Sequence, residues 1–184
     1  MIKRFLEEAA EWCRGRNGLL RAPFLLWFAY TLIKTLKDPS ACNPLWSLNL
    51  VFHEAGHLLF SYCGRFLGML GGTLLEGLMP IFGAYYFYRK RDFFSIALCF
   101  GWLSTALFSI ARYAADARAT ALPLVSMSWD SDVTHDWNYL LHQWGLLQHD
   151  QAVAFLFRSL AVGAMLICLS FGFWLVFRMI MKRD

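Results

Sequence analysis

The chain has 184 residues, of which 58% are hydrophobic, 17% aromatic and only 16% charged. Its mean hydropathy of +0.44 excludes an ordinary soluble domain, and its aromatic content excludes a disordered chain. The net charge is +4, but the basic residues gather at the two ends and at Arg89–Arg91, so nucleic acid is not an expected partner. We expect a single membrane-embedded domain over residues 1–184.

The first twenty residues are charged throughout and lack the short apolar stretch and small-residue cleavage site of a signal peptide. We expect residues 1–20 to form an amphipathic helix at the membrane interface. The apolar segment 22–33 follows, between Arg21 and Lys34, whose long side chains can reach the membrane surface from the ends of a helix. This segment is also predicted to be a helix.

Residues 45–63 form the next apolar segment, and an H-E-x-x-H motif of His53, Glu54 and His57 lies midway along it. Residues four apart share one face of an α-helix, so the imidazoles of His53 and His57 can bind one zinc ion. Glu54 can then take a proton from water as the general base. Polar contacts between membrane helices are the alternative, but ionisable groups at mid-bilayer are costly and favour a functional site.

Residues 66–88 are apolar but rich in residues that break helices. We expect the region from Gly68 to Gly83 to be re-entrant or broken, with its free backbone groups covered by protein or by a water-filled cavity. Glu76 is either a neutral buried group or an acid near the zinc or a substrate channel, and the sequence leaves both open. The helix breakers are Gly68, Gly71, Gly72, Gly77, Pro80 and Gly83.

Residues 93–111 and 159–177 are runs of nineteen uncharged residues. At about 1.5 Å per residue, each reaches roughly 28 Å, which is close to the thickness of the hydrocarbon core. The expected fold is therefore an all-α polytopic membrane protein with four to five transmembrane helices. If the basic residues are cytoplasmic, residues 115–151 form a polar loop and an amphipathic helix on the outer side.

A catalytic zinc ion needs a third protein ligand, and the candidates near the membrane are Asp116, the cluster 130–136 and, least favoured, Glu76. We expect a site that uses both Asp116 and His135, with His135 slightly favoured. Asp136 is expected to cap the following helix or to orient a neighbouring ligand through a hydrogen bond. Two further histidines on the amphipathic segment are interpreted as interfacial surface: His142 and His149.

The motif inside a hydrophobic segment, followed by a Gly-rich apolar segment and further helices, resembles the site-2 protease superfamily of intramembrane zinc metallopeptidases. The resemblance implies that His53 and His57 bind zinc, that Glu54 activates water, and that an aspartate on a later helix completes the site. Asp116 matches that aspartate by its order along the chain, although the superfamily has Asp-Gly and this chain has Asp-Ala. More specifically, the chain resembles small bacterial membrane proteins that join the motif to a downstream His-Asp-Trp, here residues 135–137.

The predicted function is thus hydrolysis of a peptide bond within or near the bilayer by a zinc (Zn²⁺) metallopeptidase. The expected partners are membrane lipids and a membrane-protein or peptide substrate, and the expected location is the bacterial inner (cell) membrane. Two alternatives remain open from the sequence. One is a zinc-dependent amidase that acts on a lipid such as a ceramide, and the other is a membrane protein that binds a metal without catalysis.

Overall fold

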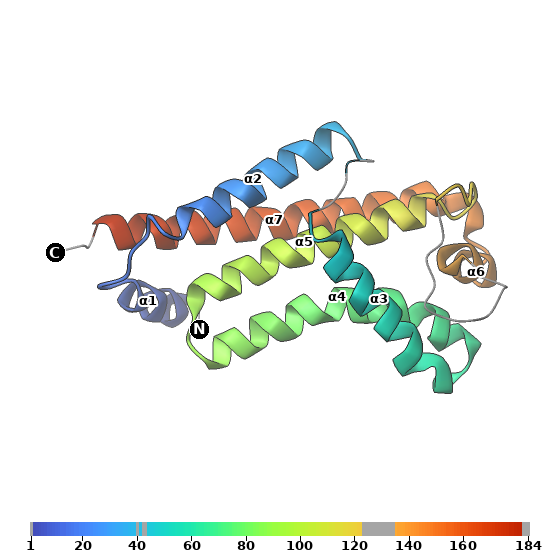
Figure 1. Ribbon diagram of the computed structural model, residues 1–184, viewed down its shortest axis with the longest axis horizontal. Helices are drawn as coiled ribbons and strands as arrows, with labels where there is room; N and C mark the ends of the chain where they lie inside the picture. Colours follow the sequence, from blue (N-terminus) through green and yellow to red (C-terminus); the bar gives the residue numbers. More distant parts are fainter. Residues whose placement is uncertain (1, 40, 42–43, 123–134, 182–184) are drawn as a thin grey trace. The chain divides into compact units, whose positions relative to one another are not determined.

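The computed structural model describes residues 2–39, 41, 44–122 and 135–181. Within these ranges every regular element is a helix, which confirms the expected all-α class. Short 3-10 turns occur at Ser61–Cys63 and Leu147–His149. The α-helices, labelled in Figure 1, are α1 (Ile2–Trp12), α2 (Ala22–Lys37), α3 (Trp46–Phe60), α4 (Arg65–Arg89), α5 (Phe93–Ala115), α6 (Asp136–Gln143) and α7 (Asp150–Met181).

Three helices in the described part of the chain are long and apolar enough to cross a membrane: Arg65–Arg89, Phe93–Ala115 and Leu147–Met181. Even the shortest, with 23 residues, reaches roughly 34 Å at about 1.5 Å per residue, which exceeds the hydrocarbon thickness of about 30 Å. By contrast, α2 and α3 contain 16 and 15 residues and reach about 24 Å at most. The chain is therefore a membrane protein, but the expected four to five crossings are not confirmed.

Helix α4 continues through all the glycines from Gly68 to Gly83, with Pro80 inside it. The re-entrant or broken segment expected from the sequence is therefore not confirmed. Two glycines instead allow α3 and α4 to approach closely, because a Cβ on Gly71 would lie 2.7 Å from the backbone oxygen of Gly56. Packing against a neighbouring helix thus outweighs the weak helix propensity of these residues.

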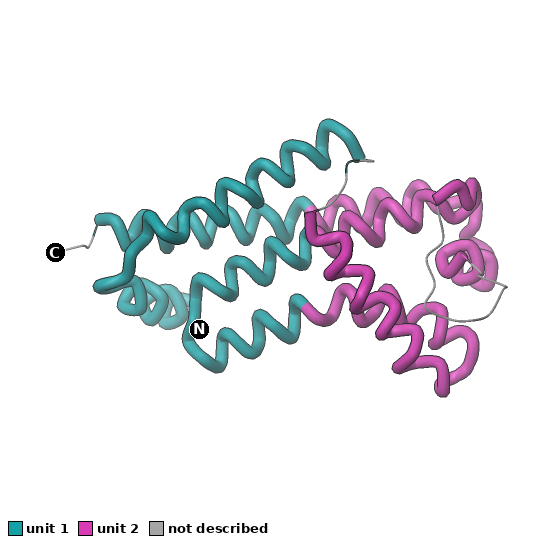
Figure 2. Tube along the Cα trace, in the orientation of Figure 1, with its two compact units in different colours: residues 1–41, 80–104, 162–184 teal, residues 42–79, 105–161 magenta. Residues whose placement is uncertain are grey.

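The chain divides into two compact units, shown in different colours in Figure 2. The first comprises Met1–Ala41, Pro80–Ser104 and Val162–Asp184. Within it, α2 packs through aromatic and aliphatic side chains against glycines of α5 and α7. A Cβ on Gly101 would lie 2.6 Å from the Phe28 ring, and a Cβ on Gly172 would lie 2.5 Å from the Leu25 side chain.

The second unit comprises Cys42–Met79 and Thr105–Ala161 and contains the motif helix. Helices α3 and α4 form a hairpin whose connection ends at Gly64, which has a φ of 91° in the left-handed region that favours glycine. The end of α5, α6 and the start of α7 share an apolar core. Its buried residues are Ile110, Ala114, Ala117, Trp137, Leu141 and Ala154.

Candidate metal centre

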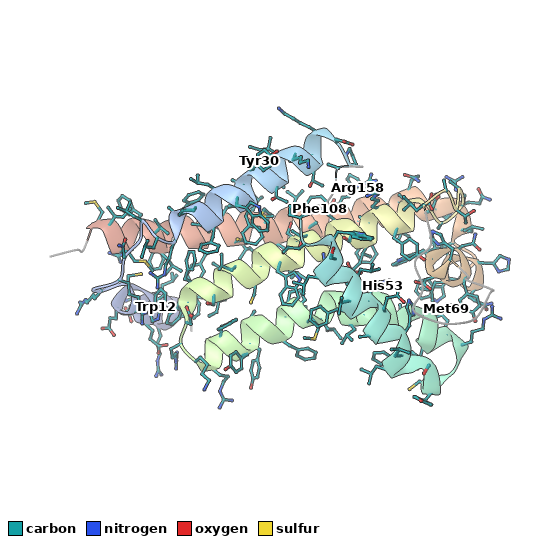
Figure 3. All side chains as sticks on the ribbon, viewed as in Figure 1. Trp12, Tyr30, His53, Met69, Phe108 and Arg158 are labelled. Carbon is teal, nitrogen blue, oxygen red and sulfur yellow. The ribbon has the colours of Figure 1, made fainter. Side chains whose placement is uncertain are left out.

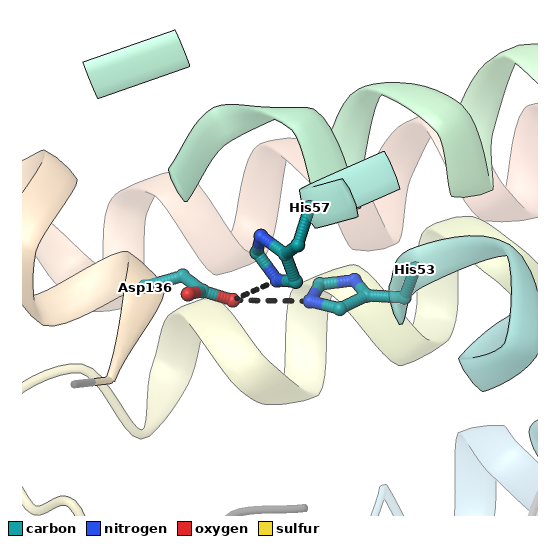
Figure 4. A group of neighbouring side chains, drawn as sticks. All are labelled: His53, His57 and Asp136. Atoms are coloured by element: carbon teal, nitrogen blue, oxygen red, sulfur yellow. Dashed lines mark hydrogen bonds and ion pairs between the residues drawn. The ribbon is translucent and has the colours of Figure 1, made fainter. Parts of the chain in front are cut away.

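The two histidines of the motif lie side by side on α3. Their ring centroids are 4.8 Å apart, and the ring planes are inclined at 78°. Both rings direct Nε2 toward one carboxylate oxygen, Oδ2 of Asp136, at 3.0 Å from His53 and 3.1 Å from His57 (Figure 4). Two residues one helical turn apart thus meet a third that follows His57 by 79 positions in the chain.

Asp136 reaches this position because it is the first residue of α6, and α6 is held at its start by several contacts. His135 caps the helix, since its Nδ1 accepts a hydrogen bond from the backbone N–H of Asn138 at 3.3 Å. The Asn138 side chain donates in turn to the backbone oxygen of Ala117, at 2.7 Å. Trp137 and Leu141 lie in the apolar core of the unit, so Asp136 is presented by a firmly packed element.

Helix α4 supplies partners for the other nitrogen of each ring. The Nδ1 atom of His57 lies 2.8 Å from the backbone oxygen of Gly68, and Nδ1 of His53 lies 3.0 Å from Oε2 of Glu76. A carbonyl oxygen can only accept, so His57 carries its proton on Nδ1 and, when neutral, offers a lone pair at Nε2. An ionised Glu76 likewise accepts a hydrogen bond from Nδ1 of His53, so a neutral His53 also has its lone pair at Nε2.

The group therefore brings three acceptor atoms together: two imidazole nitrogens and a carboxylate oxygen. These atoms of His53, His57 and Asp136 all lie within 4.8 Å of one another. Two neutral histidines whose Nε2 lone pairs face an ionised carboxylate oxygen require positive charge between them, either as protons or as a metal ion. In the described part of the chain, this group could hold a metal ion.

A glycine makes room beside these atoms. A Cβ on Gly72 of α4 would lie 2.6 Å from Nε2 of His57 and 2.7 Å from Nε2 of His53. Both ring tips can lie this close to α4 because residue 72 has no side chain. Gly72 thus permits the ring positions on which the metal group depends. Figure 3 labels His53 on α3 and Met69 on the neighbouring start of α4.

Burial and charge act in opposite directions on Asp136. Its burial alone would raise the pKa, but in the metal-free group rings protonated on both nitrogens donate hydrogen bonds from Nε2, and these hold the pKa of Asp136 below its ordinary value. The carboxylate is therefore ionised at neutral pH. Burial lowers the pKa of the neighbouring His135, which is consistent with a neutral ring that accepts the capping hydrogen bond.

The structure places Asp116 and His135 next to each other, but as a pair that is not part of the metal group. Nε2 of His135 lies 3.3 Å from Oδ2 of Asp116, outside hydrogen-bond geometry. The Asp116 carboxylate accepts backbone hydrogen bonds from Ala121 and Leu122, each 3.0 Å long, and so closes the turn after α5. The metal group in the described residues contains Asp136 and neither of these two.

The remaining candidate residues have clear positions. Glu54 is buried on α3, directly after His53. Glu76 contacts His53, whereas His142 and His149 are exposed. The part of the 130–136 cluster that precedes His135 lies outside the described residues.

From the sequence, Asp136 was one of three open candidates for the third ligand, beside Asp116 and the favoured His135, and was expected mainly to cap α6 or to orient a ligand. One signal pointed to the metal group. Trp137, Leu140 and Leu141 form the apolar side of α6, and Asp136 lies one turn before Leu140 on that same side. A carboxylate on the buried side of a short helix needs a buried partner. Which partner it meets depends on how α6 packs.

Comparison with protein-family models, with curated proteins and with solved structures finds no match to this chain. The resemblance to the site-2 protease superfamily therefore remains a prediction from the motif. A functional assignment has to come from the residues of the site and their geometry.

Proposed function

We propose that the chain is a membrane-embedded zinc metallopeptidase in which His53, His57 and Asp136 bind the metal and Glu54 is the general base. The observation that carries the proposal is the convergence of three acceptor atoms from two distant segments on one small space. Hydrogen bonding between membrane helices alone would not require Nε2 of both rings to face the same carboxylate oxygen. A cation explains this convergence directly.

The donor set favours zinc over the common hard cations. Two imidazole nitrogens and one carboxylate oxygen are typical zinc ligands, whereas magnesium and calcium prefer oxygen ligands throughout. Ligand atoms of a tetrahedral zinc ion lie about 3.3 Å apart when each bond is about 2.0 Å long. The separations of 3.0 and 3.1 Å between Nε2 and Oδ2 are close to that value. Three protein ligands leave one coordination position open, as in catalytic zinc sites.

Glu54 is the residue to which we assign the proton transfer in hydrolysis. It follows the first ligand directly in the chain and lies three positions before the second, so we expect its carboxylate near the metal group. A bound zinc ion supplies Lewis acidity, which acidifies water and polarises the scissile carbonyl group. Glu54 takes the proton from the attacking water and returns it to the leaving nitrogen as the C–N bond breaks.

The membrane limits the substrate to molecules that reach the bilayer. The metal group joins α3 to α6, and the same unit contains parts of all three helices that can cross a membrane. We therefore propose a peptide bond within or near the bilayer as the target. The zinc-dependent lipid amidase remains an outcome that the substrate test can show.

The proposal is tested on protein purified in detergent, by measuring zinc content and hydrolysis together. We expect about one zinc ion per chain in the wild type, none in His57→Ala, and full zinc without activity in Glu54→Gln. The exposed His142 offers a matched control, since His142→Ala should keep both zinc and activity. Transmembrane peptides and ceramide-like lipids are offered in parallel.

Each result has a defined meaning. A wild type that holds no zinc would end the metal assignment, and an active Glu54→Gln variant would end the role of Glu54. Cleavage of the lipid but not of the peptides would replace the peptidase with the amidase while the zinc site stands.

A further inference from the structure

Glu76 is a buried carboxylate on α4 that the proposed reaction does not use. Its side chain is 5% exposed, and Oε2 lies 3.0 Å from Nδ1 of His53. We infer that Glu76 is a positioning residue that orients His53 and strengthens it as a metal ligand, an inference that rests on the metal site proposed above. In this role Glu76 acts through His53 and does not touch the metal.

The contacts of His53 support this role, because both ring nitrogens are held by carboxylates from different helices. Glu76 of α4 holds Nδ1, and Asp136 of α6 faces Nε2. A carboxylate that accepts a hydrogen bond from Nδ1 fixes the ring orientation and tautomer of a ligating histidine and raises the basicity of its other nitrogen. The Nε2 atom of His53 is thereby held beside Gly72, where it faces Asp136.

The two histidines differ in how they are held. His57 donates to a neutral backbone oxygen, that of Gly68, and its side chain is 25% exposed. His53 is 9% exposed and is paired with a carboxyl group. Loss of Glu76 should therefore weaken His53 specifically, while the carbonyl that holds His57 stays in place.

Packing alone does not explain a carboxylate at this position. In the described part of the chain, Oε1 of Glu76 has no hydrogen-bond partner, so half of the buried carboxylate is unsatisfied. An apolar residue would fill the same place on α4 without that cost. The contact with His53 is the interaction that accounts for a glutamate here.

The test compares Glu76→Leu and Glu76→Gln with Thr73→Val, a matched control. Thr73 is also buried on α4, lies three residues before Glu76, and its hydroxyl has no hydrogen-bond partner among the described residues. Affinity for Zn²⁺ is measured by competition with a chelator, and the visible absorption of the Co²⁺-loaded protein reports the geometry of the ligands. Thermal unfolding of the metal-free proteins in detergent reports the fold.

We expect Glu76→Leu to bind Zn²⁺ about 10-fold to 100-fold more weakly than the wild type and to alter the Co²⁺ spectrum. Glu76→Gln should recover part of the affinity, because its amide oxygen can still accept the hydrogen bond but carries no charge. Thr73→Val should keep the affinity and spectrum of the wild type.

Wild-type affinity and an unchanged spectrum in both Glu76 variants would overturn the inference. If Glu76→Leu does not fold, the test rests on the near-isosteric Glu76→Gln. Wild-type Zn²⁺ affinity and an unchanged Co²⁺ spectrum in that variant would then overturn the inference. A wild type that binds no metal would overturn this inference and the proposed function together. An active Glu54→Gln variant, by contrast, would refute only the catalytic assignment.

Discussion

Gly72 is the residue whose lack of a side chain matters most to the candidate metal centre. The imidazole tips of His53 and His57 lie where a Cβ on residue 72 would meet them, at 2.6 to 2.7 Å. The Nδ1 atoms of both rings contact α4, His57 at the backbone oxygen of Gly68 and His53 at the carboxylate of Glu76. The rings therefore cannot yield to a methyl group without leaving the positions in which they face Asp136.

We predict that Gly72→Ala abolishes metal binding while the protein still folds. Alanine favours a helix over glycine by about 1 kcal/mol, so a loss of metal could not be attributed to a weakened α4. Gly77→Ala on the same helix is the matched control, because its Cβ would meet nothing closer than 4.0 Å. Zinc content of the purified variants measures the effect, and a Gly72→Ala protein with wild-type zinc would contradict the geometry described above.

Asp136 and His135 are neighbours in sequence but have different roles in the structure, and this difference can be tested. We predict that Asp136→Asn lowers zinc affinity by at least 10-fold, because the ligand loses its charge. His135→Asn should leave the affinity within about threefold of the wild type, since asparagine is a favoured helix cap that preserves α6. Competition with a chelator measures both. The opposite ranking would make His135 the ligand.

At the scale of the elements, α6 carries a metal-binding residue although it is only eight residues long. A helix this short is marginal in isolation, so its stability comes from packing. Trp137 and Leu141 provide that packing in the core shared with α5 and α7. The position of Asp136 therefore depends on how the other side chains of α6 pack in this core.

We predict that Leu141→Ala weakens zinc binding without changing any ligand. Truncation of a fully buried leucine costs about 2–5 kcal/mol, and here that cost loosens α6. Hydrogen exchange should show faster exchange of the amides of α6 than in the wild type, together with a reduced zinc affinity. The exposed Gln143 at the end of the same helix is the control, and Gln143→Ala should behave as wild type. Unchanged exchange in Leu141→Ala would show that this packing does not hold α6.

At the scale of the whole molecule, the three long apolar helices determine which segments share a side of the membrane. The turn around Arg91 joins α4 to α5, and the segment that contains α6 joins α5 to α7. One crossing by α5 separates the two connections. The basic residues of the turn favour the cytoplasmic side for it, so we expect α6 on the outer side.

We predict that cysteines introduced at Arg91 and at Gln148 react with a membrane-impermeant maleimide from opposite sides of a sealed vesicle. The experiment uses a chain whose five natural cysteines have been replaced. Labelling before and after the vesicles are opened gives the side of each position. Reaction of both positions from one side would show that α5 does not cross the membrane.

The sequence by itself determined the features that depend on spacing along one segment. Uncharged runs predict the helices that the structure shows as α5 and α7, and the interval of four between His53 and His57 places both on one face of α3. Such inferences succeed because the 3.6-residue period applies within any α-helix, whatever surrounds it. The helix boundaries were less predictable. Helix α7 begins at Asp150, whereas the uncharged run begins only at residue 159.

Only the tertiary structure decided which side chains meet from different helices. It brought Asp136 to the two histidines, paired Glu76 with His53, and left Asp116 in the turn after α5. It also showed Gly71 and Gly72 of α4 as contact points for α3 inside a continuous helix. Sequence patterns could not decide these points, because a glycine or a carboxylate in an apolar segment acquires its role from the surface packed against it, and that surface belongs to another part of the chain.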